Sequence, residues 1–206
     1  MIPIEFQPEP FDFDQKVRLK GLAFLNQEPI PQTWRNREYW RAAISDLCNS
    51  YNRICAYSAQ WIPLGEGTPT IDHFIPKSVA PNLAYEWSNF RLSSHLLNTR
   101  KSSFQDVLDP FTIQPGWFIL DFGSLFIKAG NSLDVDIRQK VMNTIKRLKL
   151  NDEDSCLQSR LSWLEPFCQG QLTFAFLKEK APFIAYELER QNLVDKIRFM
   201  YANQSS

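Results

Sequence analysis

The chain has 206 residues, of which 44% are hydrophobic and 14% aromatic, so it can bury a core, and a disordered or collagen-like protein is excluded. Its 23 Lys and Arg residues balance its 23 Asp and Glu residues, so any patch that binds phosphate must be local. No apolar stretch approaches the roughly 18 residues of a membrane span, and we expect a soluble, cytoplasmic protein with no membrane partner.

Residues 1–52 are predicted to form an extended arm followed by two helices. Prolines within the first ten residues favour the arm, because proline fixes φ and lacks an N–H group. Apolar residues over 17–25 predict a short helix. Thr33 is a suitable cap for the next segment, where apolar residues recur at helical spacing: Trp40, Ala43, Ile44, Leu47 and Tyr51.

Residues 53–108 have a different pattern. Segments 53–62 and 70–75 are short and β-prone, with glycines between them, and predict two strands joined by a loop. A short extended stretch is expected over 87–92, and a helix over 93–101 with Ser93 or Ser94 near its start. The expected order is strand, loop, strand, loop, helix.

Residues 109–206 are predicted to hold a further strand pair within 117–127, followed by helices. Apolar stripes indicate helices over 137–148, 157–164 and 183–201, and the polar tail 203–206 is expected to fray. The chain as a whole is therefore predicted to be an α+β protein.

The two histidines of the chain, His73 and His95, both lie in the central region. Asp72 and His73 are adjacent, and neighbouring residues of a strand face opposite sides, so they can share a site only where the strand ends or bends. On the helix that follows, His95, Asn98 and Lys101 are spaced three apart and share one face.

The pair Asp72-His73, followed by Asn89, Asn98 and Lys101 in that order and spacing, resembles the ββα-metal finger of HNH endonucleases. The resemblance covers about residues 53–103. It implies an HNH nuclease core over 53–108, embedded between the N-terminal arm and helices and the C-terminal strand pair and helical extension. We expect the three regions to pack as one compact unit.

The resemblance also implies a role for each matching residue. His73 would be the general base that takes a proton from the attacking water, and Asn89 would tie down the loop and orient that base. Asp72 and Asn98 would hold one divalent cation, Mg²⁺ or Mn²⁺, through oxygen ligands.

Cations near these residues would contact the scissile phosphate or its neighbours. They are Lys101, Arg100, Lys77 and Arg91. Some family members use a further histidine as a metal ligand close to the position of His95, whose role in binding metal, contacting substrate or packing in the core stays open.

Many family members also brace the finger with a zinc ion held by two Cys-x-x-Cys pairs. The corresponding positions here are Cys55, Ser58, Ser94 and Leu97. One thiolate cannot hold tetrahedral zinc, so we expect no structural zinc and apolar packing in its place. The residues expected to supply that packing are Trp61, Phe74, Trp87, Phe90 and Leu97. All four cysteines are expected to be reduced.

The function implied by the resemblance is metal-dependent hydrolysis of DNA phosphodiester bonds that leaves 5′-phosphate and 3′-hydroxyl ends. Residues 71–78 and 83–87 also look like stand-alone HNH proteins of bacterial anti-phage systems, some of which work beside an ATPase partner. We therefore expect a defence nuclease whose partners are DNA and an ATPase subunit, with the helices after residue 130 as the docking surface.

Several alternatives remain at this stage. The chain could be a non-catalytic nucleic-acid-binding or assembly subunit that keeps the finger as scaffold, or an RNA nuclease. Cys55 could act as a thiol nucleophile beside His73. The aromatic segment 117–126 could stack bases rather than form core strands, and the basic residues of 138–149 could face DNA rather than solvent.

Overall fold

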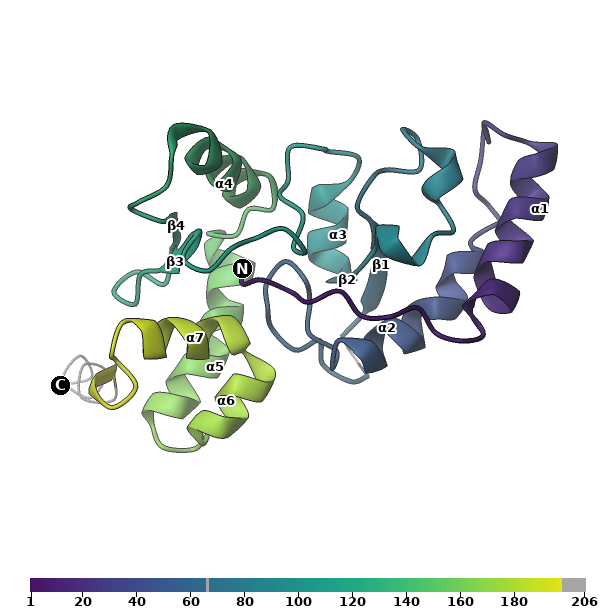
Figure 1. Cartoon of the computed structure of the whole chain (residues 1–206). Helices are drawn as coiled ribbons and strands as arrows, with labels where there is room; N and C mark the ends of the chain where they lie inside the picture. Colours follow the sequence, from purple (N-terminus) through teal and green to yellow (C-terminus); the bar gives the residue numbers. More distant parts are fainter. Residues whose placement is uncertain (66, 198–206) are drawn as a thin grey trace. The chain divides into compact units, whose positions relative to one another are not determined.

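The computed structural model describes residues 1–65 and 67–197 (Figure 1). Within these residues the fold is mixed α+β, as the sequence predicts, with two antiparallel strand pairs among helices. The chain divides into two compact units, which we call the central unit (residues 5–56 and 62–105) and the C-terminal unit (residues 1–4, 57–61 and 106 onward).

The central unit begins with helices. A π-helical turn over Asp14–Arg18 leads into α1 (Leu19–Gln27), so the helix predicted over 17–25 is confirmed. The second predicted helix starts later than expected, as a 3-10 turn over Tyr39–Ala43 followed by α2 (Ile44–Ser50). Thr33 does not cap it, because its hydroxyl accepts the N–H of Arg35 and closes a local turn instead.

The strand pair of this unit is β1 (Pro69–His73) with β2 (Phe90–Ser94), in antiparallel register that sets Asp72 opposite Arg91 and His73 opposite Phe90. The prediction that segment 53–62 is the partner of β1 is wrong. That segment is mostly turns, because Arg53 and Ala59 adopt positive φ (58° and 51°), which breaks an extended strand.

The helix α3 (His95–Lys101) follows β2 directly, so the order of elements is strand, strand, helix (Figure 1). The side chain of Ser94 accepts the N–H of Leu97 and caps the helix start, as predicted. Under the strand pair, Phe13 lies edge-on to Trp87 and Phe90, with ring centroids 5.6 and 5.9 Å apart. Phe90 is the first residue of β2, so these ring contacts join the strand pair to the start of the first helical segment.

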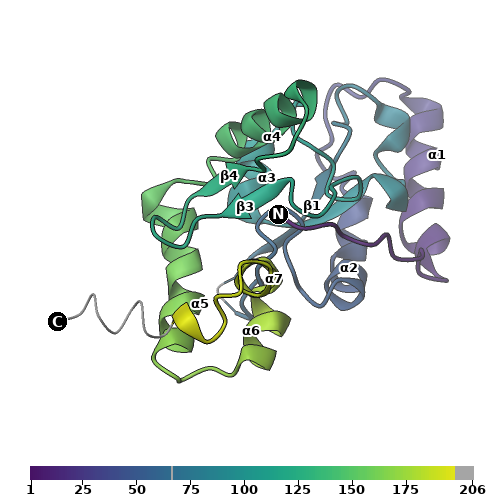
Figure 2. The ribbon, with the colours of Figure 1, turned by 60° about the vertical axis from the view of Figure 1, so that its left-hand side comes forward.

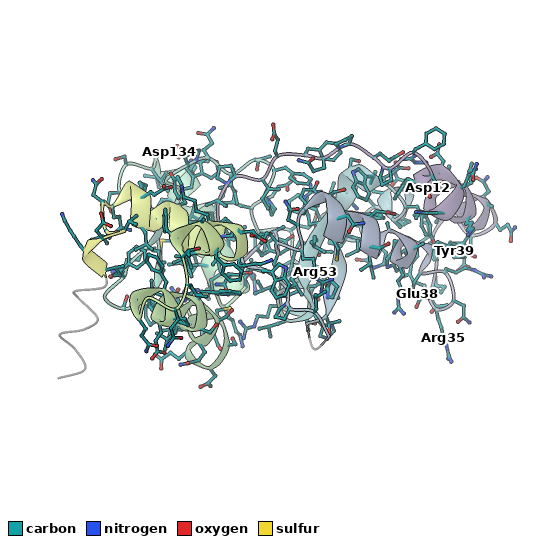
Figure 3. All side chains as sticks on the ribbon, turned by 90° about the horizontal axis from the view of Figure 1, so that it is seen from below. Asp12, Arg35, Glu38, Tyr39, Arg53 and Asp134 are labelled. Carbon is teal, nitrogen blue, oxygen red and sulfur yellow. The ribbon has the colours of Figure 1, made fainter. Side chains whose placement is uncertain are left out.

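The C-terminal unit holds β3 (Phe118–Leu120) and β4 (Ile127–Ala129), which run antiparallel side by side (Figure 2). The predicted strand pair is thus confirmed, and the burial of Phe118 and Leu120 supports core strands rather than a base-stacking surface. The helix predicted over 137–148 is confirmed as α4 (Val135–Arg147), capped by Asp134 (Figure 3), whose side chain accepts the N–H of Ile137.

Three more α-helices follow between residues 153 and 190. A π-helical turn over Glu153–Leu157 and α5 (Gln158–Cys168) confirm the predicted second stripe. The helix α6 (Phe174–Lys180) was not predicted, and α7 (Pro182–Arg190) ends well before residue 201. It ends there because Asn192 adopts φ 55°. The last part of the predicted third stripe, 198–201, and the predicted fraying tail lie outside the described residues.

A buried carboxylate joins α7 to β3. Glu187 accepts the N–H of Leu120 at 2.9 Å and pairs with Arg190 at 2.7 Å, and Gln191 donates to the carbonyl of Leu120 at 2.7 Å. The backbone N–H and carbonyl of Leu120 in β3 are therefore both bonded by side chains, one from α7 and one from the residue that follows it.

Replacing Glu187 by alanine should lower the free energy of unfolding by about 1–3 kcal/mol, because a buried N–H of β3 loses its acceptor. Urea denaturation measures this loss. Glu189→Ala is the matched control, because Glu189 pairs with Lys178 on the surface and should contribute at most about 1 kcal/mol. Equal losses in the two variants would contradict the role of Glu187.

In the described part of the chain, every helix is too short or too polar to cross a membrane.

Candidate active site

A cavity of about 330 Å³ opens in the central unit where β1 ends. Four of the residues expected at the site line it, among them Asp72 and His73 from the end of β1 and Asn98 from the middle of α3. Lys77, from the loop that follows β1, lines it as well, and the indole of Trp34 forms another wall. The cavity brings together oxygen, nitrogen and cationic groups that are distant in the sequence.

His73 is held on several sides. Its ring lies edge-on to Trp40 and Phe90, with centroids 4.8 and 5.2 Å away, and only 6% of the residue is exposed. Its Nε2 is 2.9 Å from the carbonyl oxygen of Ala84. A carbonyl can only accept, so Nε2 carries the proton and the lone pair of the neutral ring is on Nδ1.

The environment keeps His73 neutral. Burial is the main cause that lowers its pKa to about 3, and the nearby charge of Lys77 lowers it further. At neutral pH the ring is therefore uncharged, and its acceptor atom is Nδ1.

The position of the Ala84 carbonyl depends on a tight contact with α1. The neighbouring residue Tyr85 packs on the backbone of the helix at Gly21, where a Cβ would lie 2.0 Å from the ring. The hydroxyl of Tyr85 also donates to the carbonyl of Arg37 at 2.9 Å. Residues 83–87 entered the prediction only through their resemblance to stand-alone HNH proteins, and no role was predicted for the Ala84 carbonyl, because a backbone acceptor has no signature in residue type.

Asp72 and Asn98 are the oxygen donors of the cavity. The carboxylate of Asp72 is 2% exposed, and its Oδ1 lies 3.0 Å from the ammonium of Lys101. Asn98 donates from Nδ2 to the hydroxyl of Thr70 and the carbonyl of Ile71, at 3.0 and 3.2 Å. Nδ2 has two hydrogens, so Oδ1 is the atom that the Asn98 amide can offer to a cation.

Asn89 clamps the loop between β1 and β2. Its Oδ1 accepts the N–H of Ile75 at 2.8 Å, and its Nδ2 donates to the carbonyls of Ile75 and Leu83 at 3.0 and 3.2 Å. These contacts hold both ends of the segment that carries Lys77 and leads to Ala84.

Replacing Asn89 by alanine should lower the free energy of unfolding by about 1–3 kcal/mol, because a partly buried N–H and two carbonyls lose their partner. Urea denaturation measures this loss, and hydrogen exchange at the Ile75 amide should become faster. Asn82→Ala is the control, since Asn82 is an exposed residue of the same loop. An unchanged exchange rate at Ile75 would count against the clamp.

Lys77 is the cation beside the base. Its ammonium lies 3.5 Å from Nδ1 of His73 and over the ring faces of Trp40 and Trp34, 4.6 and 5.9 Å from their centroids. Burial lowers the pKa of Lys77, and the negative charge of Asp72 opposes that shift. Lys77 is thus a cation in the lining of the cavity.

The remaining predicted cations occupy different places. Lys101 is fully buried and donates to the carbonyls of His73 and Phe74, at 3.1 and 3.0 Å. Arg91 is also buried, and its guanidinium donates to the carbonyls of Ser88 and Phe90. In the structure, therefore, Lys101 and Arg91 bond protein acceptors rather than facing the cavity.

Arg100 is half-buried on α3, and His95 is exposed at the start of that helix, where its backbone N–H donates to the carbonyl of Thr68. Neither residue lines the cavity as the structure describes it. Their contacts with metal or substrate stay predictions.

Cys55 is buried away from solvent, with 1% of its surface exposed. Its sulfur accepts the backbone N–H of Ser94 at 3.3 Å and lies 3.9 Å from the hydroxyl of Ser93. A nucleophilic thiol needs access to substrate, so this position favours a structural role for Cys55.

Among residues 1–65 and 67–197, no three or more His, Cys, Asp or Glu side chains are grouped in a way that could hold a metal ion. The cavity offers a different donor set, one carboxylate and one carboxamide. Both are hard oxygen donors, and such ligands suit Mg²⁺ or Mn²⁺, which keep several waters or take substrate oxygens as further ligands.

Comparison with known proteins finds no protein-family model and no curated protein that matches this chain.

Proposed function

We propose that the chain is an HNH-type endonuclease that hydrolyses DNA with the help of one divalent cation, and that β1, β2 and α3 are its ββα-metal finger. The observation that carries the proposal is the tautomer of His73. The Ala84 carbonyl holds the proton on Nε2, which leaves the ring lone pair on Nδ1, 3.5 Å from the ammonium of Lys77, and His73 lines one cavity with Asp72 and Asn98.

The donor set fits the cation. The Asp72 carboxylate and Oδ1 of Asn98 line one cavity, and both are oxygen ligands of the kind that Mg²⁺ and Mn²⁺ prefer. When bound, the cation would stabilise the negative charge that grows on the phosphate and the leaving 3′ oxygen.

The protein's own residues would carry out the proton transfer. Nδ1 of His73 takes a proton from the attacking water, while the Nε2–H bond to Ala84 fixes the ring and stabilises the positive charge that the ring gains. Lys77 contacts a phosphate oxygen, and Asn89 keeps the loop of Lys77 and Ala84 in place. The products would carry 5′-phosphate and 3′-hydroxyl ends.

We further propose that the nuclease is an effector of a bacterial anti-phage system that needs a partner, such as an ATPase subunit, to reach DNA. The chain has no net charge, and Lys101 and Arg91 are committed to protein carbonyls. Non-specific affinity for DNA grows with the number of phosphates that cations neutralise, so the free chain should bind DNA weakly.

Incubation of the purified chain with supercoiled plasmid, with Mg²⁺, with Mn²⁺ or with EDTA, tests the proposal. Nicking or linearisation is expected only with metal, and ligation without prior phosphorylation should show 5′-phosphate ends. Single-stranded RNA in parallel distinguishes an RNA nuclease. If the chain cuts neither substrate, alone or with proteins that co-purify from its host, the assembly-subunit alternative is favoured instead.

A further inference from the structure

The ammonium of Lys101 is enclosed by three acceptors of β1 and the residue that follows it. It lies 3.0 Å from Oδ1 of Asp72, 3.1 Å from the carbonyl of His73 and 3.0 Å from the carbonyl of Phe74. The side chains of Lys101 and Asp72 are 0% and 2% exposed. A lysine ammonium has three hydrogens, so these contacts use its full donor capacity.

These contacts explain how adjacent residues of a strand serve one cavity. Successive carbonyls of an extended strand point in opposite directions, so two of them can bond one ammonium only where the chain bends. β1 ends at His73, and the bend follows at Phe74. The bend is what allows Asp72 and His73 to line the same cavity.

We propose that Lys101 is a positioning residue of the metal site, which holds the Asp72 carboxylate by Oδ1 and fixes the bend beside His73. The inference rests on the proposed function. It replaces the expectation that Lys101 contacts the phosphate, because a fully enclosed ammonium has no hydrogen left to donate to a substrate.

Two measurements on Lys101→Met separate positioning from phosphate contact. Residues that orient a metal ligand typically change metal affinity or activity by about 10–100-fold when they are replaced. We therefore expect the dissociation constant of Mn²⁺, measured without DNA by electron paramagnetic resonance, to rise in that range. The kcat for DNA cleavage should fall by about 10–100-fold while KM for DNA stays nearly constant.

Two further variants distinguish a specific loss of metal binding from a general loss of stability. Lys101→Gln retains N–H donors for Asp72 and one carbonyl, and should restore part of the Mn²⁺ affinity. Leu97→Ala lies on the same helix and removes a buried side chain, so it should destabilise the fold without changing Mn²⁺ affinity. Each variant is measured where circular dichroism shows it to be folded.

The outcomes distinguish this inference from the proposed function. If the unmodified chain binds Mn²⁺ and cuts DNA, but Lys101→Met raises only KM for DNA, then Lys101 contacts phosphate and the positioning role is wrong. If Leu97→Ala and Lys101→Met lose Mn²⁺ affinity equally, then Lys101 only stabilises the fold and the positioning role is wrong. An unmodified chain that neither binds Mn²⁺ nor cuts DNA overturns both.

Discussion

Replacing His73 by alanine should lower the rate of DNA cleavage by about 10²–10⁴-fold, the usual contribution of a general base. The reason is the orientation of the His73 imidazole ring. Nε2 is committed to the Ala84 carbonyl, so Nδ1 is the ring atom that can take a proton from water, and His73 lines the cavity.

Single-turnover cleavage of an end-labelled duplex with saturating Mn²⁺ measures the chemical step of His73→Ala directly. His73 is almost fully buried, so alanine also leaves a cavity beside Trp40 and Phe90. His73→Gln fills most of that space but cannot act as a base, and it should be as slow as alanine. Mn²⁺ affinity should be nearly unchanged in both variants, since His73 is not a proposed ligand. A His73 variant that cuts DNA at the rate of the unmodified chain would contradict the proposal that His73 is the general base.

Acidification should destabilise the metal-free chain more than it destabilises His73→Gln. The folded pKa of His73 is about 3, lowered from 6.5 mainly by burial and then by the charge of Lys77. Between these values the unfolded chain binds a proton that the folded chain does not, so stability falls as the pH falls through this window. At pH 4.5 the difference should be roughly 2–3 kcal/mol.

Urea denaturation in EDTA from pH 7 to pH 4.5 measures this difference. The two chains should have a constant offset above about pH 6.5, and the unmodified chain should lose stability faster below it. Parallel stability curves over the whole range would show that His73 is not held neutral by burial.

Local patterns were enough to predict several elements. The capping serine before α3 and the apolar stripes of α4 and α5 depend on residues close in sequence, and those predictions are confirmed. The partner of β1 was predicted wrongly, because the β-prone residues of 53–62 give no sign of the positive φ at Arg53 and Ala59. The N–H of Arg53 bonds back to the carbonyl of Cys48 in α2, which continues a turn instead of a strand. The pairing of β1 with β2 instead joins residues about twenty positions apart.

The candidate site shows the same difference between what local patterns predict and what depends on distant contacts. Residue type and spacing pointed to Asp72, His73 and Asn98, and the structure brings these three to one cavity. The resemblance implied that Lys101 contacts the scissile phosphate. The carbonyls of His73 and Phe74 enclose it instead, and the sequence carries no sign of where a backbone acceptor will lie.

The most direct test of the account is a crystal of the chain soaked in Mn²⁺ and measured at the manganese absorption edge. We predict one anomalous peak in the cavity, bonded to a carboxylate oxygen of Asp72 and Oδ1 of Asn98, at about the 2.0–2.2 Å typical of small divalent cations with oxygen ligands. The Nδ1 atom of His73 should face a water on that ion. A cavity without manganese, or manganese bound only elsewhere, would contradict the account.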